Sequence, residues 1–246
     1  SFSVGVLQPG AEQYNWNSTN YERPETKDLI IYELLLRDFL EDHSYQTLID
    51  TLDYLDRLGV TAIELMPVNE FEGNLSWGYN PAFHLALDKY YGTQNTFKAF
   101  VDAAHSRGIA VILDVVLNHA FGRSPIIRLW NEGDYGAPTS ENPYANSIAK
   151  HPYNVGYDLN HESAATRYFS KRVMQYWLEE YNIDGFRFDL SKGFTQVDNL
   201  NDVGAWGSYD ASRIAIWKDY NNFIRSIDST AYVILEHFAD NSEEKA

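Results

Sequence analysis

The chain has 246 residues, of which 44% are hydrophobic and 22% charged, an ordinary composition for a globular protein. No stretch approaches the run of about 18 apolar residues that a transmembrane helix needs, and a net charge of −16 argues against a nucleic-acid partner. The absence of cysteine excludes disulfides and thiolate chemistry and leaves the cellular compartment open.

Residues 1–28 carry no helical period and are expected to form an N-terminal arm or the tail of a preceding domain. From residue 29 onward the pattern alternates between strand and helix, which is typical of a parallel sheet with crossover helices. The expected strands are residues 29–34, 60–65, 109–116, 184–190 and 232–236.

Between these strands, apolar residues recur at steps of three and four, which predicts helices. The first helix has Leu48, Leu52, Leu55 and Leu58 on its pattern and ends at Gly59, and later helices include residues 97–104, 169–181 and 214–227. Residues 69–91 are expected to form a long loop, and residues 117–163 an inserted loop subdomain after the third strand. The polar residues 240–246 are expected to be a frayed end.

This order predicts an α/β fold of the (β/α)8 TIM-barrel type, with only about the first five β/α units present. The partial barrel comprises residues 29–116 and 164–246. Five strands leave two unpaired edges, so the alternatives are an open α/β sheet or a natural protein that continues beyond Ala246. We expect the second.

Asp189 and Glu236 each follow an apolar run, at residues 185–188 and 232–235. The carboxyl ends of barrel strands share one rim, so the two carboxylates are expected to face each other. Glycoside hydrolysis uses such a pair, about 5–5.5 Å apart in the retaining geometry. Arg187 lies on the same strand face as Asp189 and would keep that nucleophile ionised, while Glu236 is the better proton donor. The alternative is a structural ion pair of Arg187 with Asp189, with Glu236 only solvated.

Asp114, Asn118 and His119 form a second polar cluster where the third strand ends. In the functional interpretation, Asn118 offers a carbonyl oxygen to a metal ion and His119 hydrogen-bonds a substrate hydroxyl. A strand end with a satisfied Asn and a surface His would give the same pattern, so spacing alone leaves both interpretations open.

Several short segments carry a more specific signal. They are DVVLNH at 114–119, GFRFD at 185–189, LE at 235–236, YDLN at 157–160, WGYNP at 77–81 with YGT at 91–93, and IYEL at 31–34 with RDF at 37–39. In this order and separation they resemble the signature regions of the α-amylase family of glycoside hydrolases. The segment at 31–39 resembles the first strand in branches that include pullulanases, isoamylases and branching enzymes.

The resemblance implies a role for each matching residue. Asp189 would be the catalytic nucleophile and Glu236 the general acid/base. The residues implied to hold the sugar are Arg187 and His119, which would contact it, Tyr79, which would stack against it, and Asp114, which would organise the site from beneath.

The resemblance also implies that Asn118 and Asp158 could help to bind a structural Ca²⁺, with no cofactor required for the chemistry. The family's usual histidine after the nucleophile region is absent, because Lys192 is followed by Gly193. The family's third essential carboxylate, an Asp preceded by His near the end of strand seven, has no counterpart in these residues. We therefore expect the 246 residues alone to have negligible hydrolytic activity.

These observations favour an enzyme that cleaves α-1,4-glucosidic bonds of starch- or glycogen-type glucans by a retaining double displacement. Its expected partners are an α-glucan and the missing C-terminal barrel strands of the same parent chain. The alternatives are α-1,6 debranching, a branching or transglycosylating enzyme, and a catalytically silent relative that only binds glucan. A metal-dependent barrel hydrolase is discounted, because the seven histidines show no H-x-H or H-x-x-x-H spacing.

Overall fold

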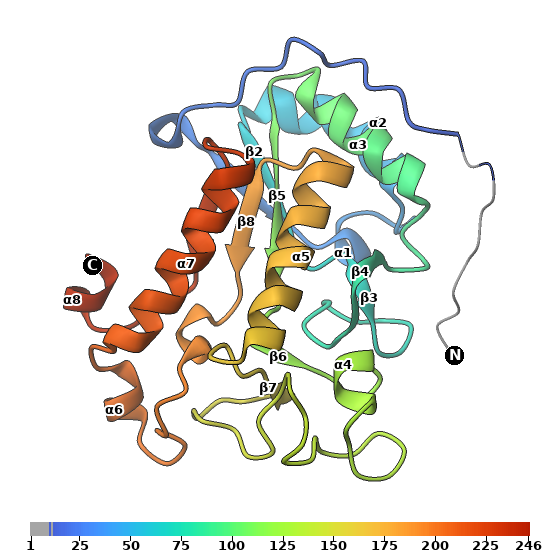
Figure 1. Ribbon diagram of the computed structural model, residues 1–246. Helices are drawn as coiled ribbons and strands as arrows, with labels where there is room; N and C mark the ends of the chain where they lie inside the picture. The colour runs from blue at the N-terminus through green and yellow to red at the C-terminus, as the bar shows by residue number, and fades with distance from the viewer. Residues whose placement is uncertain (1–9, 11) are drawn as a thin grey trace.

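The structure is a computed structural model and describes residue 10 and residues 12–246. Its centre is a five-stranded sheet in which every neighbouring pair is parallel, in the order β1-β2-β5-β8-β9 (Figure 1). The strands are β1 (Ile31–Leu34), β2 (Ala62–Leu65), β5 (Ala110–Val115), β8 (Gly185–Phe188) and β9 (Tyr232–Leu235). All five lie within the predicted ranges and in the predicted order, which confirms the partial barrel architecture.

Four long helices alternate with these strands, as predicted. They are α2 (Tyr45–Leu58), α3 (Gln94–His105), α5 (Ala164–Tyr181) and α7 (Ala211–Ile227). Helix α2 packs beside α3, and α5 beside α7 (Figure 1). The shorter helical turns are η1 (Thr26–Asp28), α1 (Leu36–Phe39), α4 (Pro125–Arg128), η2 (Ser191–Phe194), α6 (Val203–Gly207) and α8 (Asn241–Glu244). In the part of the chain that the structure describes, no helix is long and apolar enough to cross a membrane.

Most of the predicted apolar positions of helix α2 lie on its buried face. Leu48, Leu52 and Leu55 are fully buried, and Gly59 ends the helix with a left-handed φ of 83°. Leu58 is 55% exposed, so its predicted place on the apolar face is wrong. At about 100° per residue, ten residues rotate Leu58 roughly 80° away from Leu48 and off the buried stripe.

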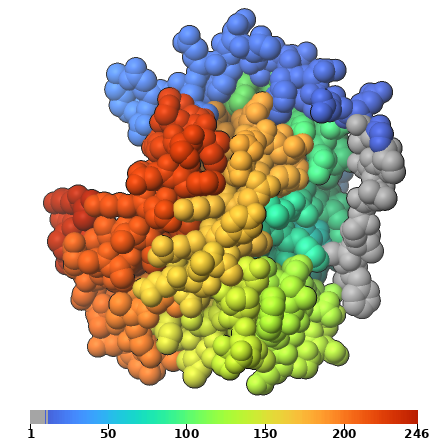
Figure 2. Space-filling model, in the orientation of Figure 1, coloured from blue at the N-terminus to red at the C-terminus, as the bar shows by residue number. Residues whose placement is uncertain are grey.

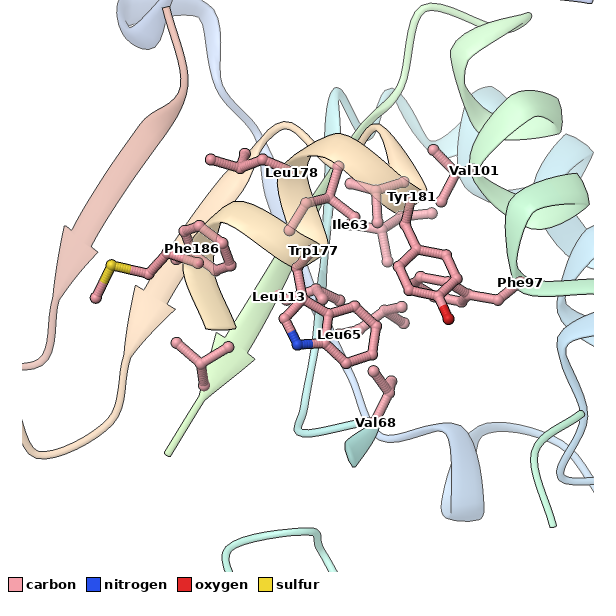
Figure 3. Close-up of a cluster of buried hydrophobic side chains, with 14 of the residues drawn as sticks. Ile63, Leu65, Val68, Phe97, Val101, Leu113, Trp177, Leu178, Tyr181 and Phe186 are labelled. Carbon is pink, nitrogen blue, oxygen red and sulfur yellow. The ribbon is translucent and has the colours of Figure 1, made fainter. Parts of the chain in front are cut away.

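The main core lies between the sheet and its helices. Figure 3 shows Trp177 and Tyr181 of α5 among the side chains of Leu65, Leu113 and Phe97. The Trp177 and Tyr181 rings stack with centroids 4.8 Å apart, and Phe97 meets Tyr181 edge-on at 5.1 Å. This continuous packing of aromatic and branched side chains holds the strands in register.

Residues 69–91, predicted as a long loop, contain regular structure. They form an antiparallel pair, β3 (Asn69–Phe71) and β4 (Pro81–Leu87), joined by residues 72–80. The register of this pair shifts twice along β3, so it lacks the strict alternation by which a hairpin is recognised.

The segment 117–163 lies at the carboxyl end of the sheet, where the strand arrows of Figure 1 point. Its regular structure consists of α4 and the short antiparallel pair β6 (His119–Ala120) and β7 (Tyr157–Asp158). It has a small core of its own, made of Ala120, Ile126, Ile127, Ala145 and Leu159. The division into arm, barrel and inserted subdomain stays a prediction.

The N-terminal arm crosses the opposite end of the sheet (Figures 1 and 2). Asp102 of α3 accepts hydrogen bonds from the backbone and side chains of Asn17 and Ser18, and Arg23 forms ion pairs with Asp184 and Asp228. These contacts belong to the part of the predicted arm at residues 12–28. Residues 1–9 and 11 of the predicted arm lie outside the described part of the chain.

The C-terminal residues are not the frayed end that the sequence predicts. Glu243 of α8 is buried, and its carboxylate forms an ion pair with the fully buried Arg213 of α7, with Oε2 2.8 Å from Nη2. His237 Nε2 lies 2.8 Å from Glu243 Oε1. Arg213, which lies far from Glu243 in the sequence, thus stabilises Glu243 in the interior.

Candidate active site

The carboxyl ends of β5, β8 and β9 bring the predicted residues together. Asp114 lies on β5 directly beside Arg187 on β8, and Arg187 is paired in register with Ile234 on β9. Asp189 and Glu236 follow β8 and β9 immediately. The parallel register therefore places all four functional side chains on one rim, as expected from the sequence.

Arg187 is the centre of this cluster. Its Nη1 lies 3.0 Å from Asp114 Oδ2 and 3.1 Å from Asp189 Oδ1, and its Nη2 lies 3.0 Å from Glu236 Oε1. Although burial lowers the pKa of Arg187, the neighbouring carboxylates raise it above its ordinary value. The planar guanidinium has the rigid fork of donors that such multiple pairing requires.

Asp189 is held by more than its ion pair. Asn118 Nδ2 donates to both the backbone carbonyl of Asp189 (2.8 Å) and its Oδ2 (2.9 Å). The backbone N–H of Asp189 bonds the carbonyl of Val115 on β5. Arg187 on one oxygen and Asn118 on the other leave the carboxylate fixed in orientation, which a nucleophile needs.

Glu236 is not surrounded by the apolar side chains that its sequence context suggests. Its Oε1 faces Arg187, and its Oε2 accepts a hydrogen bond from the backbone N–H of Leu190 at 2.8 Å. The residues of the apolar run belong to β9 itself, whereas Glu236 lies one step beyond, at the charged rim. Its side chain is 28% exposed, so a ligand can reach it.

Leu190 is a residue of this site that sequence reasoning missed. Its backbone has φ 42° and ψ 48°, the left-handed region that a Leu rarely adopts. This conformation directly follows Asp189 and places the Leu190 N–H against Glu236. No sequence signal marks it, because the side chain type argues against the conformation.

Asp114 and Tyr79 are joined beneath the rim. The Tyr79 hydroxyl donates to Asp114 Oδ2 at 2.7 Å. Burial raises the pKa of Asp114 to about 8, although the charge of Arg187 and the hydrogen bond from Tyr79 act in the opposite direction. Tyr79 reaches this position because Gly78 (φ 97°) passes against Pro67, where a Cβ would lie 2.4 Å from the Pro67 carbonyl oxygen.

His119 is brought to the site but is buried, with 1% exposure. Its Nε2 lies 2.8 Å from the backbone carbonyl of Tyr79 and its Nδ1 faces Asn118 Oδ1. Burial lowers the pKa of His119 to about 4. Both ring nitrogens thus contact the protein, and the ring supports Tyr79. Its contact with a sugar stays a prediction.

A cluster of acidic side chains lies next to this site. Among the described residues, the carboxylates of Glu33, Glu64 and Asp114 have oxygen atoms that all lie within 4.8 Å of one another. Arg187 Nε lies 4.0 Å from Glu64 Oε1 and supplies a positive charge to the group. The cluster therefore adjoins the rim formed by Asp114, Arg187, Asp189 and Glu236, and the same guanidinium neutralises part of its charge.

The two residues that the resemblance implied for calcium lie close to the site but do not fit that ion. Asn118 gives its amide hydrogens to Asp189, and its oxygen faces His119. Asp158 Oδ2 accepts from Asn146 and from the backbone of Lys150, whereas its Oδ1 has no hydrogen-bond partner in the described part of the chain. Calcium takes about six to eight oxygen ligands. One uncommitted carboxylate oxygen does not amount to such a set.

Comparison with known proteins agrees with this geometry. The family model "Alpha amylase, catalytic domain" matches residues 41–126 and 150–246. A malto-oligosyltrehalose trehalohydrolase of Saccharolobus solfataricus is 35% identical over 72% of this chain and 30% of its own length. Alpha-amylase 3 of Dictyoglomus thermophilum is 29% identical over 88% of this chain and 44% of its own length.

The fold is also found in solved structures. The type I pullulanase of Bacillus subtilis, solved with maltose, superposes with a TM-score of 0.73 at 27% identity, over 94% of this chain and 34% of its own. The chain spans less than half the length of each of these three relatives. By its match to the catalytic-domain model and its parallel β/α architecture, the chain belongs to the α-amylase family of glycoside hydrolases.

Proposed function

We propose that the protein carrying this chain cleaves α-glucosidic bonds of α-glucans with retention of configuration. The observation that carries the proposal is the shared guanidinium, since Arg187 contacts both Asp189 and Glu236. One side chain bridging two carboxylates keeps them close, which suits the retaining separation of about 5–5.5 Å better than the wider inverting one.

In the first step, Asp189 attacks the anomeric carbon of the sugar while Glu236 gives a proton to the departing glycosidic oxygen. The C–O bond to the leaving group breaks as a C–O bond to Asp189 forms, giving a covalent glycosyl-enzyme. In the second step, Glu236 takes a proton from water, whose oxygen displaces Asp189 from the same carbon. The chemistry needs the two carboxylates and no cofactor.

The neighbouring residues prepare this exchange. Arg187 and Asn118 hold Asp189 ionised and oriented. Tyr79, fixed through Asp114 and His119, offers its ring to the sugar at the cleavage point. A catalytically silent, glucan-binding relative is the less favoured alternative, because it would not need both carboxylates on one guanidinium.

The preferred bond is the α-1,4 linkage of starch- or glycogen-type glucans, in line with the likeness to an α-amylase. Cleavage of α-1,6 linkages, or branching by transglycosylation, is the second candidate. It is favoured by the likeness to a pullulanase and by the segments at 31–39 and 77–81. Product analysis of the natural gene product on amylose, pullulan and a malto-oligosyltrehalose separates these activities. Release of products from none of them would contradict the proposal.

We further propose that residues 1–246 alone do not suffice for catalysis. The family's strand-seven carboxylate, expected to grip the sugar in the transition state, has no counterpart among them. A pure preparation of this chain should release no reducing sugar from soluble starch above background, and should regain activity when supplied with the remaining barrel strands of its parent. Turnover by the chain alone would overturn this part of the proposal.

A further inference from the structure

His151 lies in the segment 117–163 and is fully buried. Its ring stacks flat on Trp206 of α6, with the centroids 5.3 Å apart and the planes 9° from parallel. Trp206 is itself fixed by a hydrogen bond from Nε1 to the carbonyl of Lys192 at 3.1 Å. One imidazole thus joins the segment between β5 and α5 to elements that come after β8.

The His151 ring fills the space beside position 193. A Cβ built on Gly193 would lie 2.9 Å from His151 Nε2 and 3.1 Å from its Cε1, and 3.4 Å from the Cβ of Asn118. Gly193 lies on η2, in the region where the resemblance places a histidine. The His151 ring therefore occupies the space that a side chain at position 193 would need.

The His151 ring also lies beside Asp158. His151 Nδ1 faces the carbonyl of Pro152 at 2.7 Å, so Nδ1 donates, and Nε2 lies 3.5 Å from Asp158 Oδ1. Among the described residues, neither Nε2 nor this Oδ1 has a hydrogen-bond partner. The second oxygen of Asp158 is fully used by Asn146 and Lys150. The ring of His151 thus lies against both Asp158 and Gly193, and fills the join between segment 117–163 and η2.

We infer that the side chain of His151 takes the place of the calcium ion that the family pattern implies, and that it holds segment 117–163 to η2 and α6 without a metal. The consequence reaches the active site, because Asp158 is paired with His119 across β6 and β7. His151 is on this account a positioning residue. The inference does not depend on which glucan, if any, the protein cleaves.

The first experiment measures metal dependence of the unmodified chain. Its Tm is followed by circular dichroism after EDTA treatment and after addition of Ca²⁺ or Zn²⁺, and bound metals are measured by mass spectrometry. We expect the same Tm in the untreated chain, after EDTA, and with Ca²⁺ or Zn²⁺ added, and less than stoichiometric metal. Stoichiometric calcium or zinc, or a Tm that falls with EDTA and returns with either ion, would overturn the inference, since a ligand that binds the folded state must raise Tm.

The second experiment is a double-mutant cycle of Gly193→Ala and His151→Ala. Each single substitution should lower Tm by about 5 °C or more, the first by pushing the ring out and the second by removing it. In the His151→Ala background, Gly193→Ala should cost less than about 1 °C, because the space is then open. Additive losses would contradict the inference.

The matched control is Tyr153→Ala. Tyr153 also contacts the Trp206 ring, at 5.8 Å, but is 67% exposed and is far less enclosed than His151. Its loss should change Tm by much less than that of His151. An equal loss would show that contact with Trp206 alone, without the packing against Gly193, explains the effect. If a His151 variant does not fold, the metal measurements on the unmodified chain still decide the question.

Discussion

Glu236 Oε1 and Arg187 Nη2 lie 3.0 Å apart across the neighbouring strands β8 and β9, and the same guanidinium contacts Asp114 and Asp189. Three carboxylates therefore depend on one positive charge that is 14% exposed. The contacts of Arg187 therefore hold the three side chains together at the rim.

Replacing Arg187 should therefore damage both stability and activity. Arg187→Met removes the cation that contacts Asp189 and Glu236 and should cost about 3 kcal/mol of unfolding free energy, because uncompensated buried charge is expensive. Arg187→Lys keeps the charge but loses the planar set of guanidinium donors. It should therefore be more stable than Arg187→Met and still lose most activity. Urea denaturation and turnover assays check this. The exposed Arg172→Lys serves as control and should change neither.

Glu236→Gln should abolish proton donation while preserving the shape of the site. We expect kcat to fall by about 10²–10⁴-fold on glucan, the usual weight of general acid–base catalysis. Azide, which needs no general base, should restore turnover of an activated glucosyl substrate and give the α-glucosyl azide. Glu162, an exposed carboxylate outside the site, provides the control variant Glu162→Gln. Unchanged kcat in Glu236→Gln would remove Glu236 from the mechanism.

The buried histidines should make the fold sensitive to acid. Burial lowers the pKa of His161 to about 3, and its nitrogens contact Leu117 O and the Tyr220 hydroxyl, each at 2.7 Å. Below a pH of about 6.5 the unfolded chain binds a proton at this residue that the folded chain excludes. Unfolding free energy should therefore fall as pH drops from about 6.5 toward 3.

A variant isolates this contribution. His161→Gln should lower stability at neutral pH yet flatten the loss between about pH 6.5 and 4, because the titrating group is gone. The half-buried surface residue His43 gives the control His43→Gln, whose pH profile should follow the unmodified protein. An unchanged slope in His161→Gln would show that other groups cause the acid sensitivity.

The N-terminal arm should stabilise the fold through Asp102 of helix α3. Its carboxylate accepts from Tyr14, Asn17 and Ser18, and although burial acts in the opposite direction, these hydrogen bonds hold its pKa well below the usual range. Asp102→Asn should lower the unfolding free energy by about 2 kcal/mol at neutral pH, as expected for hydrogen bonds to a charged group. Thermal unfolding checks this against the exposed control Asp56→Asn, which should have little effect.

The meeting of the acidic side chains at one rim could be predicted, because the same local pattern recurs along the chain. Asp114, Asp189 and Glu236 each end an apolar strand, and parallel strands bring such ends to one edge. The β3–β4 pair could not be predicted in this way, because shifts of register interrupt the alternating pattern of a hairpin. The burial of Glu243 depends on Arg213 in another helix, and no local pattern shows that pairing.

Leu190 and His151 also could not be predicted from the sequence. Leu190 enters the site through a left-handed backbone conformation that its residue type disfavours. His151 gains its place only because position 193 is glycine and Trp206 lies behind it. In both cases the structure depends on neighbours distant in sequence, so reading each segment alone could not reveal it.

The central claim, that Asp189 attacks the sugar, is tested most directly by trapping the covalent intermediate. The natural gene product is incubated with a fluorine-substituted α-glucosyl fluoride, digested with pepsin, and its peptides are analysed by mass spectrometry. We expect one glucosyl adduct, on the peptide containing Asp189, and none in Asp189→Asn. An adduct on Glu236 or another carboxylate, or turnover by Asp189→Asn at the unmodified rate, would contradict it.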